Sequence, residues 1–188
     1  MPRPLTGIVI ANLRPEKGIE VLLRALALVA RHRQPLIWIC GAVRDADYAQ
    51  RCRELTRRLG LRGSVRFLGP RDDIPQLLAN ADFGAIPSLS ESGPLVLAEL
   101  LAAGLPVVAT EAGSLARRAQ SLGLRDFVPP GDEAALAAAL DRLISLTPTE
   151  CAARGEQGRI LAECHFDIAA AMPRWYGVYE DALRNRRL

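Results

Sequence analysis

The chain of 188 residues has the length of one ordinary α/β domain, and nearly half of its residues are apolar, so a core of useful size is available. Its net charge of +3 is too small to indicate a nucleic-acid-binding protein. No apolar run reaches the length of a membrane span, and residues 1–6 are too short and proline-rich for a signal peptide.

Short apolar, β-branched runs alternate with amphipathic stretches along the chain. In chain order, the expected strands cover 7–13, 36–42, 64–68, 83–87, 106–109 and, as a short sixth strand, 126–128. The expected helices cover 18–33, 47–59, 74–79, 95–103, 115–120, 133–146 and 149–184, the last being two helices broken near 165–167. Gly104 is the expected end of one helix, and Asp132 is the expected N-cap of another. This alternation predicts a single Rossmann-like domain over residues 1–188, a three-layer α/β/α sandwich around a parallel sheet of about six strands.

Several reactive side chains have ordinary explanations. The four cysteines are scattered without metal-like spacing, as expected for a reduced, cytoplasmic protein. His32 and His165 are expected to be surface or packing residues rather than catalytic ones. The arginines between positions 51 and 62 suit a solvated helix face, with contact to an anionic membrane or polymer as the alternative.

Chemistry is expected at the carboxyl ends of the strands, where parallel sheets bind ligands. The loop after the fourth strand reads SLSESGPLVLAE over 88–99, with Glu91 in the loop and Glu99 inside the next helix. Two helical turns, about 11 Å, separate the carboxylates, so they cannot share a proton or a metal but can hold two ends of an extended ligand. The helix start between them suits a phosphate. This layout predicts a nucleotide-sugar site; a loop carboxylate and a solvated helix residue are the alternative.

The loop after the first strand, NLRPEKG over 12–18, supplies the cations that a diphosphate needs. Arg14 and Lys17 are both available there. Other well-known signatures are absent from the sequence: the dinucleotide-binding glycine motif, the Walker A loop and the G-x-S-x-G nucleophile elbow. Asn12 at the end of the first strand, where an acidic pair would be needed, argues against a phospho-acceptor receiver domain.

Taken in order, these segments resemble the C-terminal, donor-binding domain of the group 1 glycosyltransferases, which are retaining enzymes of the GT-B fold. The resemblance covers essentially the whole chain. It rests on PEKG at 15–18, SVRFLG at 64–69, ADFGAIPS at 81–88, the Glu91/Glu99 pair, AAGLPVVAT at 102–110 and VPPGD at 128–132.

The resemblance implies a role for each matching residue. Lys17 contacts the donor diphosphate, Glu91 holds hydroxyls of the transferred sugar, and Glu99 binds the nucleotide ribose. The loop through Ser92 and Gly93 to Leu95 turns its amides to the distal phosphate. The implied catalytic residues are therefore Lys17 and Glu91, which act with retention at the anomeric carbon and without a metal or another cofactor. Their contribution is to stabilise charge on the departing nucleoside diphosphate.

Three positions depart from the family pattern. The family commonly has an arginine where this chain has Asn12, and Arg14 is a displaced substitute, so both are expected to face the donor. Gly93-Pro94 replaces Phe-Gly and removes one amide donor. Arg117 stands near the place where a glutamate is often found. These departures leave open a catalytically silent nucleotide-sugar-binding or scaffold module, and an epimerase-like domain acting on sugar nucleotides is a third alternative.

The resemblance also implies a missing partner. Enzymes of this family have an N-terminal acceptor domain that this chain lacks, so the chain is expected to be a fragment, or else a subunit beside a separate partner. The final helix, with Trp175, Tyr176 and Tyr179, resembles the segment that crosses back to that domain. Alone, the chain is expected to be inactive. The full enzyme is expected to transfer a sugar to a glycan or lipid-linked acceptor in the cytoplasm, with peripheral contact at the inner face of the cytoplasmic membrane left open.

Overall fold

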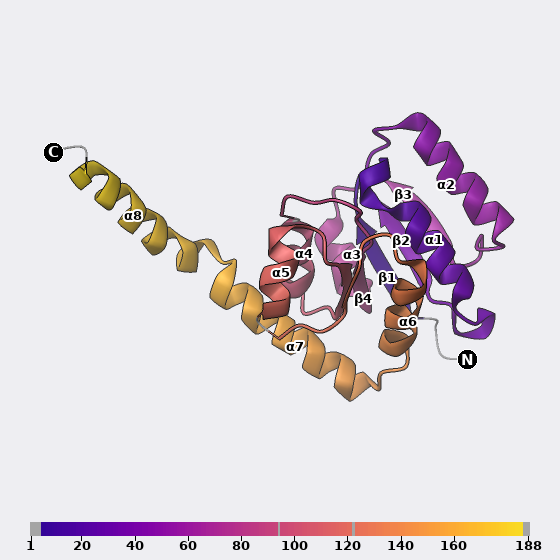
Figure 1. The fold of residues 1–188 in the computed structure, drawn as a ribbon. Coiled ribbons are helices and arrows are strands. Elements are labelled where there is room, and N and C mark those ends of the chain that lie inside the picture. Colours follow the sequence, from indigo (N-terminus) through magenta and orange to yellow (C-terminus); the bar gives the residue numbers. More distant parts are fainter. Residues whose placement is uncertain (1–4, 94, 122, 186–188) are drawn as a thin grey trace.

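A six-stranded parallel sheet forms the centre of the molecule (Figure 1), in a computed structural model that describes residues 5–93, 95–121 and 123–185. The strands are β1 Thr6–Ile10, β2 Leu36–Cys40, β3 Val65–Gly69, β4 Phe83–Ile86, β5 Val107–Thr110 and β6 Phe127–Val128. Their order is β3-β2-β1-β4-β5-β6, and every neighbouring pair is parallel. This parallel sheet confirms the predicted fold class. Strands that are apolar on both faces require a helical layer on each side.

Helices cover both faces of the sheet. They are α1 Ile19–Leu28, α2 Ala46–Arg58, α3 Ile74–Asn80, α4 Leu95–Ala102, α5 Gly113–Ser121, α6 Glu133–Ile144, α7 Pro148–His165 and α8 Ile168–Asn185, with short 3₁₀ helices η1 Pro15–Lys17 and η2 Arg31–Arg33. One buried cluster joins α1, α2 and α6 to the sheet, and a second joins α3, α4, α5 and α7 to the other face. Asp132 caps α6 as predicted, since its side chain accepts a hydrogen bond from the Ala135 amide.

The first strand and the first helix are both shorter than predicted. The strand expected over 7–13 ends at Ile10, because the Asn12 side chain takes the Ala42 amide that a continuing ladder would use. The helix expected over 18–33 ends at Leu28, since Val29 is extended and the Gln34 side-chain amide donates to the carbonyls of Leu26 and Val29.

The final helix, α8, projects from the body of the molecule (Figure 1). Trp175, Tyr176 and Tyr179 on this helix remain 56 %, 60 % and 60 % exposed. Its main neighbour is α7. None of the helices in the part of the chain that the structure describes is long and apolar enough to cross a membrane.

Two buried thiols should make the fold less stable at alkaline pH. Burial raises the pKa of Cys40 and the pKa of Cys52 from 9.0 to about 11. Between these values the unfolded chain releases both protons while the folded chain keeps them, so the free energy of unfolding should fall as pH rises from 9 to 11. Urea unfolding at about pH 8 and pH 10.5 measures the change. A Cys40→Ala/Cys52→Ala variant should lose much of this dependence, and an equal slope in both proteins would contradict the assignment.

Candidate functional site

A cavity of about 250 Å³ opens at the carboxyl ends of β1 and β4. Its apolar floor comes from the two strands, and its polar groups are Lys17 and Glu91. Gly93, Leu95 and Val96, at the start of α4, complete the wall. The loops predicted to carry the chemistry, those after the first and fourth strands, thus meet at one cavity.

Lys17 and Glu91 form an ion pair inside this cavity. The Lys17 Nζ donates to Glu91 Oε1, and the two side chains are only 16 % and 11 % exposed. Lys17 is also the only lysine in the chain, where every other basic residue apart from the two histidines is an arginine. A cation and a carboxylate held together and largely shielded from water can each make strong hydrogen bonds to a polar ligand that separates them.

Backbone contacts hold the two loops together. The Leu89 amide donates to the Glu16 carbonyl at 2.8 Å, which joins the β4–α4 loop to η1. Gly18 has φ +63°, and a Cβ atom placed on it would lie 1.9 Å from the Pro87 carbonyl oxygen. Only glycine combines this backbone conformation with so close an approach.

Two buried hydroxyl groups, those of Ser88 and Thr110, hold Glu91 in place. The sequence patterns did not indicate either of them as a site residue. Ser88 Oγ donates to Glu91 Oε1 at 2.8 Å, and Thr110 Oγ1 donates to the Ser88 carbonyl at 2.6 Å. Both residues are 2 % exposed. Ser88 ends the ADFGAIPS segment, three residues before the loop carboxylate, and this spacing was the signal in the sequence that could have indicated its role.

The start of α5 holds the far side of the same loop. Ser114 Oγ donates to the Ser92 carbonyl at 3.0 Å. A Cβ on Gly113, which has φ +84°, would lie 2.7 Å from the Glu91 carbonyl oxygen. The loop that carries Glu91 is therefore fixed between η1 on one side and α5 on the other.

The remaining predicted site residues lie at the rim of the cavity or away from it. Asn12 Oδ1 accepts from the Ala42 amide at 3.0 Å, and Arg14 Nε pairs with Glu16 at 3.2 Å, so neither side chain lines the cavity. Glu99 is exposed on α4, as expected for the alternative of a solvated helix residue. Ser92 is exposed and Leu95 is 77 % exposed at the rim. Pro94 and residues 1–4 lie outside the described residues.

A second cavity, of about 540 Å³, lies at the opposite ends of the strands. It adjoins the starts of β5 and β6, and the Arg154–Asp126 ion pair lies in its wall. Although it is the larger, it is not at the strand ends where α/β sheets bind their ligands. The Lys17–Glu91 cavity is therefore the candidate functional site.

Comparisons with known proteins agree on one relationship. Residues 5–146 match the family described as Glycosyl transferases group 1. The chain is 34 % identical over 193 residues to D-inositol 3-phosphate glycosyltransferase of Salinispora arenicola, covering 96 % of this chain and 42 % of that protein. The same enzyme of Corynebacterium diphtheriae is 35 % identical over 181 residues, covering 92 % and 42 %.

Solved structures give the same picture. HepE from Anabaena, in complex with UDP and glucose, superposes with a TM-score of 0.82 at 28 % identity and covers 94 % of this chain and 48 % of that one. Sucrose-phosphate synthase from Thermosynechococcus elongatus has a TM-score of 0.83 at 26 % identity, covering 97 % and 46 %. The chain thus spans less than half the length of these relatives.

Proposed function

Because the chain belongs to the group 1 glycosyltransferases, we propose that it binds the nucleoside diphosphate sugar donor of such an enzyme. The observation that carries the proposal is the shielded Lys17–Glu91 pair in the cavity at the ends of β1 and β4. A cation binds diphosphate oxygens and a carboxylate accepts hydrogen bonds from sugar hydroxyls, and this pair supplies both groups.

Each group in the cavity has a proposed task. Lys17 binds the diphosphate and neutralises the charge that develops when the nucleotide departs. Glu91 accepts hydrogen bonds from hydroxyls of the transferred sugar, and Ser88 holds that carboxylate in place. The start of α4, through Gly93 and Leu95, offers amides and a positive helix end to the phosphate. Glu99, two turns along α4, binds the ribose.

The proposed reaction is transfer of the sugar, with retention, to a glycan or lipid-linked acceptor, and it needs no metal. The acceptor is bound by a separate N-terminal domain of the same enzyme or by a partner subunit. What supports a partner is the exposed aromatic surface of α8 together with the share of the relatives that the chain spans, 42 %. The four free cysteines support a cytoplasmic place of action. We further propose that the enzyme acts at the inner face of the cytoplasmic membrane.

Calorimetric titration tests donor binding directly. The folded chain, titrated with uridine, guanosine and adenosine diphosphate sugars, should release or absorb heat with at least one of them. Binding should also raise the midpoint temperature of unfolding by mass action. A folded sample that gives neither signal with any of the three donors would overturn the proposal.

Ser88→Ala should weaken donor binding without abolishing it. Glu91 keeps its ion pair with Lys17 but loses the hydrogen bond that orients its carboxylate. A less well oriented carboxylate should bind the sugar hydroxyls less strongly, with an affinity reduced by up to about 10-fold. Ser90→Ala is the matched control, since Ser90 is exposed in the same loop. Equal affinities for the two variants would show that Ser88 does not position Glu91.

Binding without turnover is the second candidate function. It is favoured by the positions of Asn12 and Arg14, because Lys17 is the one basic side chain among the described residues that line the cavity. A single cation suffices to bind a diphosphate but stabilises a departing one less well. NMR of a bound donor, with the partner half added, separates the two functions. Transferase activity predicts loss of the donor's anomeric signal, epimerase activity predicts a new sugar signal, and binding without turnover predicts that the donor stays chemically unchanged.

A further inference from the structure

One edge of the sheet concentrates the positive charge of the molecule. Residues 21–71 contain eleven arginines and three acidic residues, although the whole chain carries only +3. Between Leu55 and Arg71 there is no acidic residue at all. Residues 46–69 form α2, the turn after it and the edge strand β3, which is the first strand in the order of the sheet.

Ion pairs separate the arginines of residues 21–71 into two groups. Arg24, Arg33, Arg51 and Arg71 pair with Glu133, Asp141, Glu20 and Asp73. The other seven are exposed and have no ion pair within the described residues; four of these, Arg53, Arg57, Arg62 and Arg66, are here called the basic edge. Charges without internal partners are free to attract an external anion.

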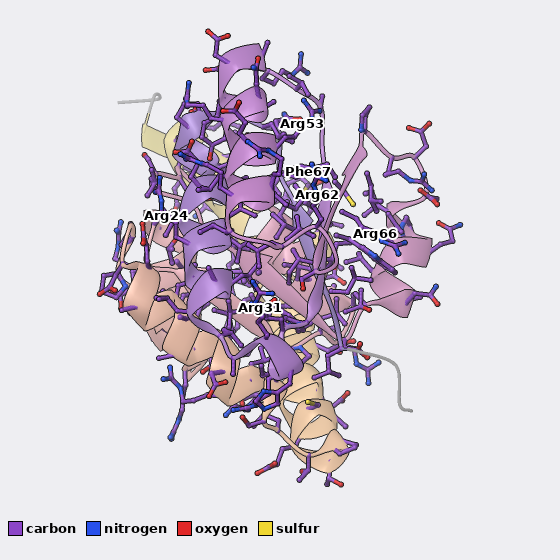
Figure 2. The ribbon with its side chains drawn as sticks, turned by 90° about the vertical axis from the view of Figure 1, so that its right-hand side faces the viewer. Arg24, Arg31, Arg53, Arg62, Arg66 and Phe67 are labelled. Atoms are coloured by element: carbon purple, nitrogen blue, oxygen red, sulfur yellow. The ribbon has the colours of Figure 1, made fainter. Side chains whose placement is uncertain are left out.

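The arginines of the basic edge lie on one side of the molecule. Arg53 lies over the ring of Phe67 on β3, with 5.9 Å from its guanidinium carbon to the ring centre. This contact shows which side of α2 is turned to β3, and Arg57, four residues on, is on the same side. Figure 2 looks onto this side of the molecule, where Arg53, Arg62 and Arg66 lie around Phe67.

Local structural roles account for only part of this arrangement. Basic residues at the end of α2 interact favourably with the helix dipole, which explains Arg57. A charged residue on an edge strand prevents strands of other molecules from pairing there, which explains Arg66. The contact with the Phe67 ring accounts in part for Arg53. No such reason applies to Arg62, and like charges at positions 53 and 57 destabilise the helix that carries them.

From this arrangement we infer that the basic edge is a docking surface for a bilayer rich in anionic lipid. None of its four arginines lines either of the two cavities described above, which favours an extended surface over a pocket for a small anion. Nucleic acid is disfavoured, because the aromatic residues between 44 and 71 are only Tyr48, which is buried, and Phe67, which is half-buried beneath Arg53, so neither ring is presented for bases to stack on. Arginine forks bind headgroup phosphates in pairs of hydrogen bonds.

This placement is compatible with the proposed donor site. The basic edge lies at β3, whereas the Lys17–Glu91 cavity opens between the ends of β1 and β4. α8 projects from the opposite side of the molecule (Figure 1). A bilayer on the basic edge therefore leaves both the cavity and the exposed aromatic residues of α8 accessible. The inference extends the proposed membrane location to a specific surface, and it does not depend on donor binding.

Co-sedimentation with vesicles tests the inference. The chain should pellet with phosphatidylcholine vesicles that contain about 30 mol% phosphatidylglycerol, but not with pure phosphatidylcholine, and about 0.5 M salt should release it. Each arginine near an anionic bilayer contributes about five-fold to partitioning. The variant Arg53→Gln/Arg57→Gln/Arg62→Gln/Arg66→Gln should therefore partition about 600-fold more weakly and no longer pellet.

The matched control removes the same charge elsewhere: Arg142→Gln/Arg159→Gln/Arg174→Gln/Arg184→Gln. This variant should pellet nearly as well as the unmodified chain, and circular dichroism should show both variants folded. Donor titration should be unchanged in the basic-edge variant, which separates this test from that of the proposed function. The inference is overturned if the unmodified chain does not pellet, if both variants lose binding equally, or if a DNA duplex binds the basic edge more tightly than the vesicles do.

Discussion

Gly18→Ala should destabilise the folded chain by about 3 kcal/mol or more, the largest effect that we expect from a single added methyl group. Gly18 has φ +63°, which costs free energy for any residue with a Cβ, and that Cβ would lie 1.9 Å from the Pro87 carbonyl oxygen. Backbone, rather than a flexible side chain, would have to move. Urea unfolding followed by circular dichroism measures the loss.

The same substitution should also impair the candidate site. Moving Gly18 away from Pro87 separates η1 from the β4–α4 loop and breaks the hydrogen bond from the Leu89 amide to the Glu16 carbonyl. Gly63→Ala is the control, because a Cβ there meets nothing within 4 Å and Gly63 has no positive φ. Its stability should stay within about 1 kcal/mol of the unmodified chain. Similar unfolding midpoints for the two variants would show that the contact with Pro87 is not needed.

Lys17→Ala should reduce the affinity for a nucleoside diphosphate by about 10- to 150-fold, because one charge-assisted hydrogen bond contributes about 1.5–3 kcal/mol. Glu91→Ala should act differently. It frees Lys17 from its ion pair, so nucleoside diphosphate binding should be maintained or strengthened. Binding of the complete sugar nucleotide should weaken, since the acceptor for the sugar hydroxyls is lost. Calorimetry with both ligands on both variants gives the comparison.

The control for these two variants is Glu163→Ala, an exposed residue of α7 that should leave both affinities unchanged. Lys17 also allows a chemical test, because it is the only lysine in the chain. Acetylation removes its charge, and a bound nucleoside diphosphate should slow its acetylation, as measured by mass spectrometry of the Lys17 peptide. If Glu91→Ala weakened the diphosphate as much as Lys17→Ala does, the division of tasks between them would be wrong.

The sequence by itself determined the architecture, because local patterns control it. Each strand is an apolar run that must be covered on both faces, and each helix has an apolar stripe of the right period, so the alternation predicts a layered parallel sheet. Caps followed equally local rules: Asp132 begins α6, and Gly104, with φ +70°, follows the end of α4. Helix ends were less predictable, as Leu28 shows, since the Gln34 side chain reaches back to end α1 there.

The sequence also indicated which residues carry chemistry, but not how they pair. Lys17 and Glu91 were both expected at strand ends, 74 positions apart in the chain. Their contact depends on β1 lying beside β4, a neighbour relationship between strands that no local pattern encodes. The contribution of Ser88 and Thr110 was missed for the same reason, because their hydrogen bond joins residues 22 positions apart.

Which charged residues form ion pairs depended most on the tertiary structure. In the sequence, all the arginines between 51 and 62 are alike, and a solvated helix face was the expected reading. In the fold, Arg51 forms an ion pair with Glu20 of α1. Arg53, Arg57 and Arg62 form no ion pair with any acidic residue among the described residues. An ion pair depends on a distance of a few ångström, which only the packing of elements determines. Local patterns thus specified the elements and their chemistry, and packing specified which groups act together.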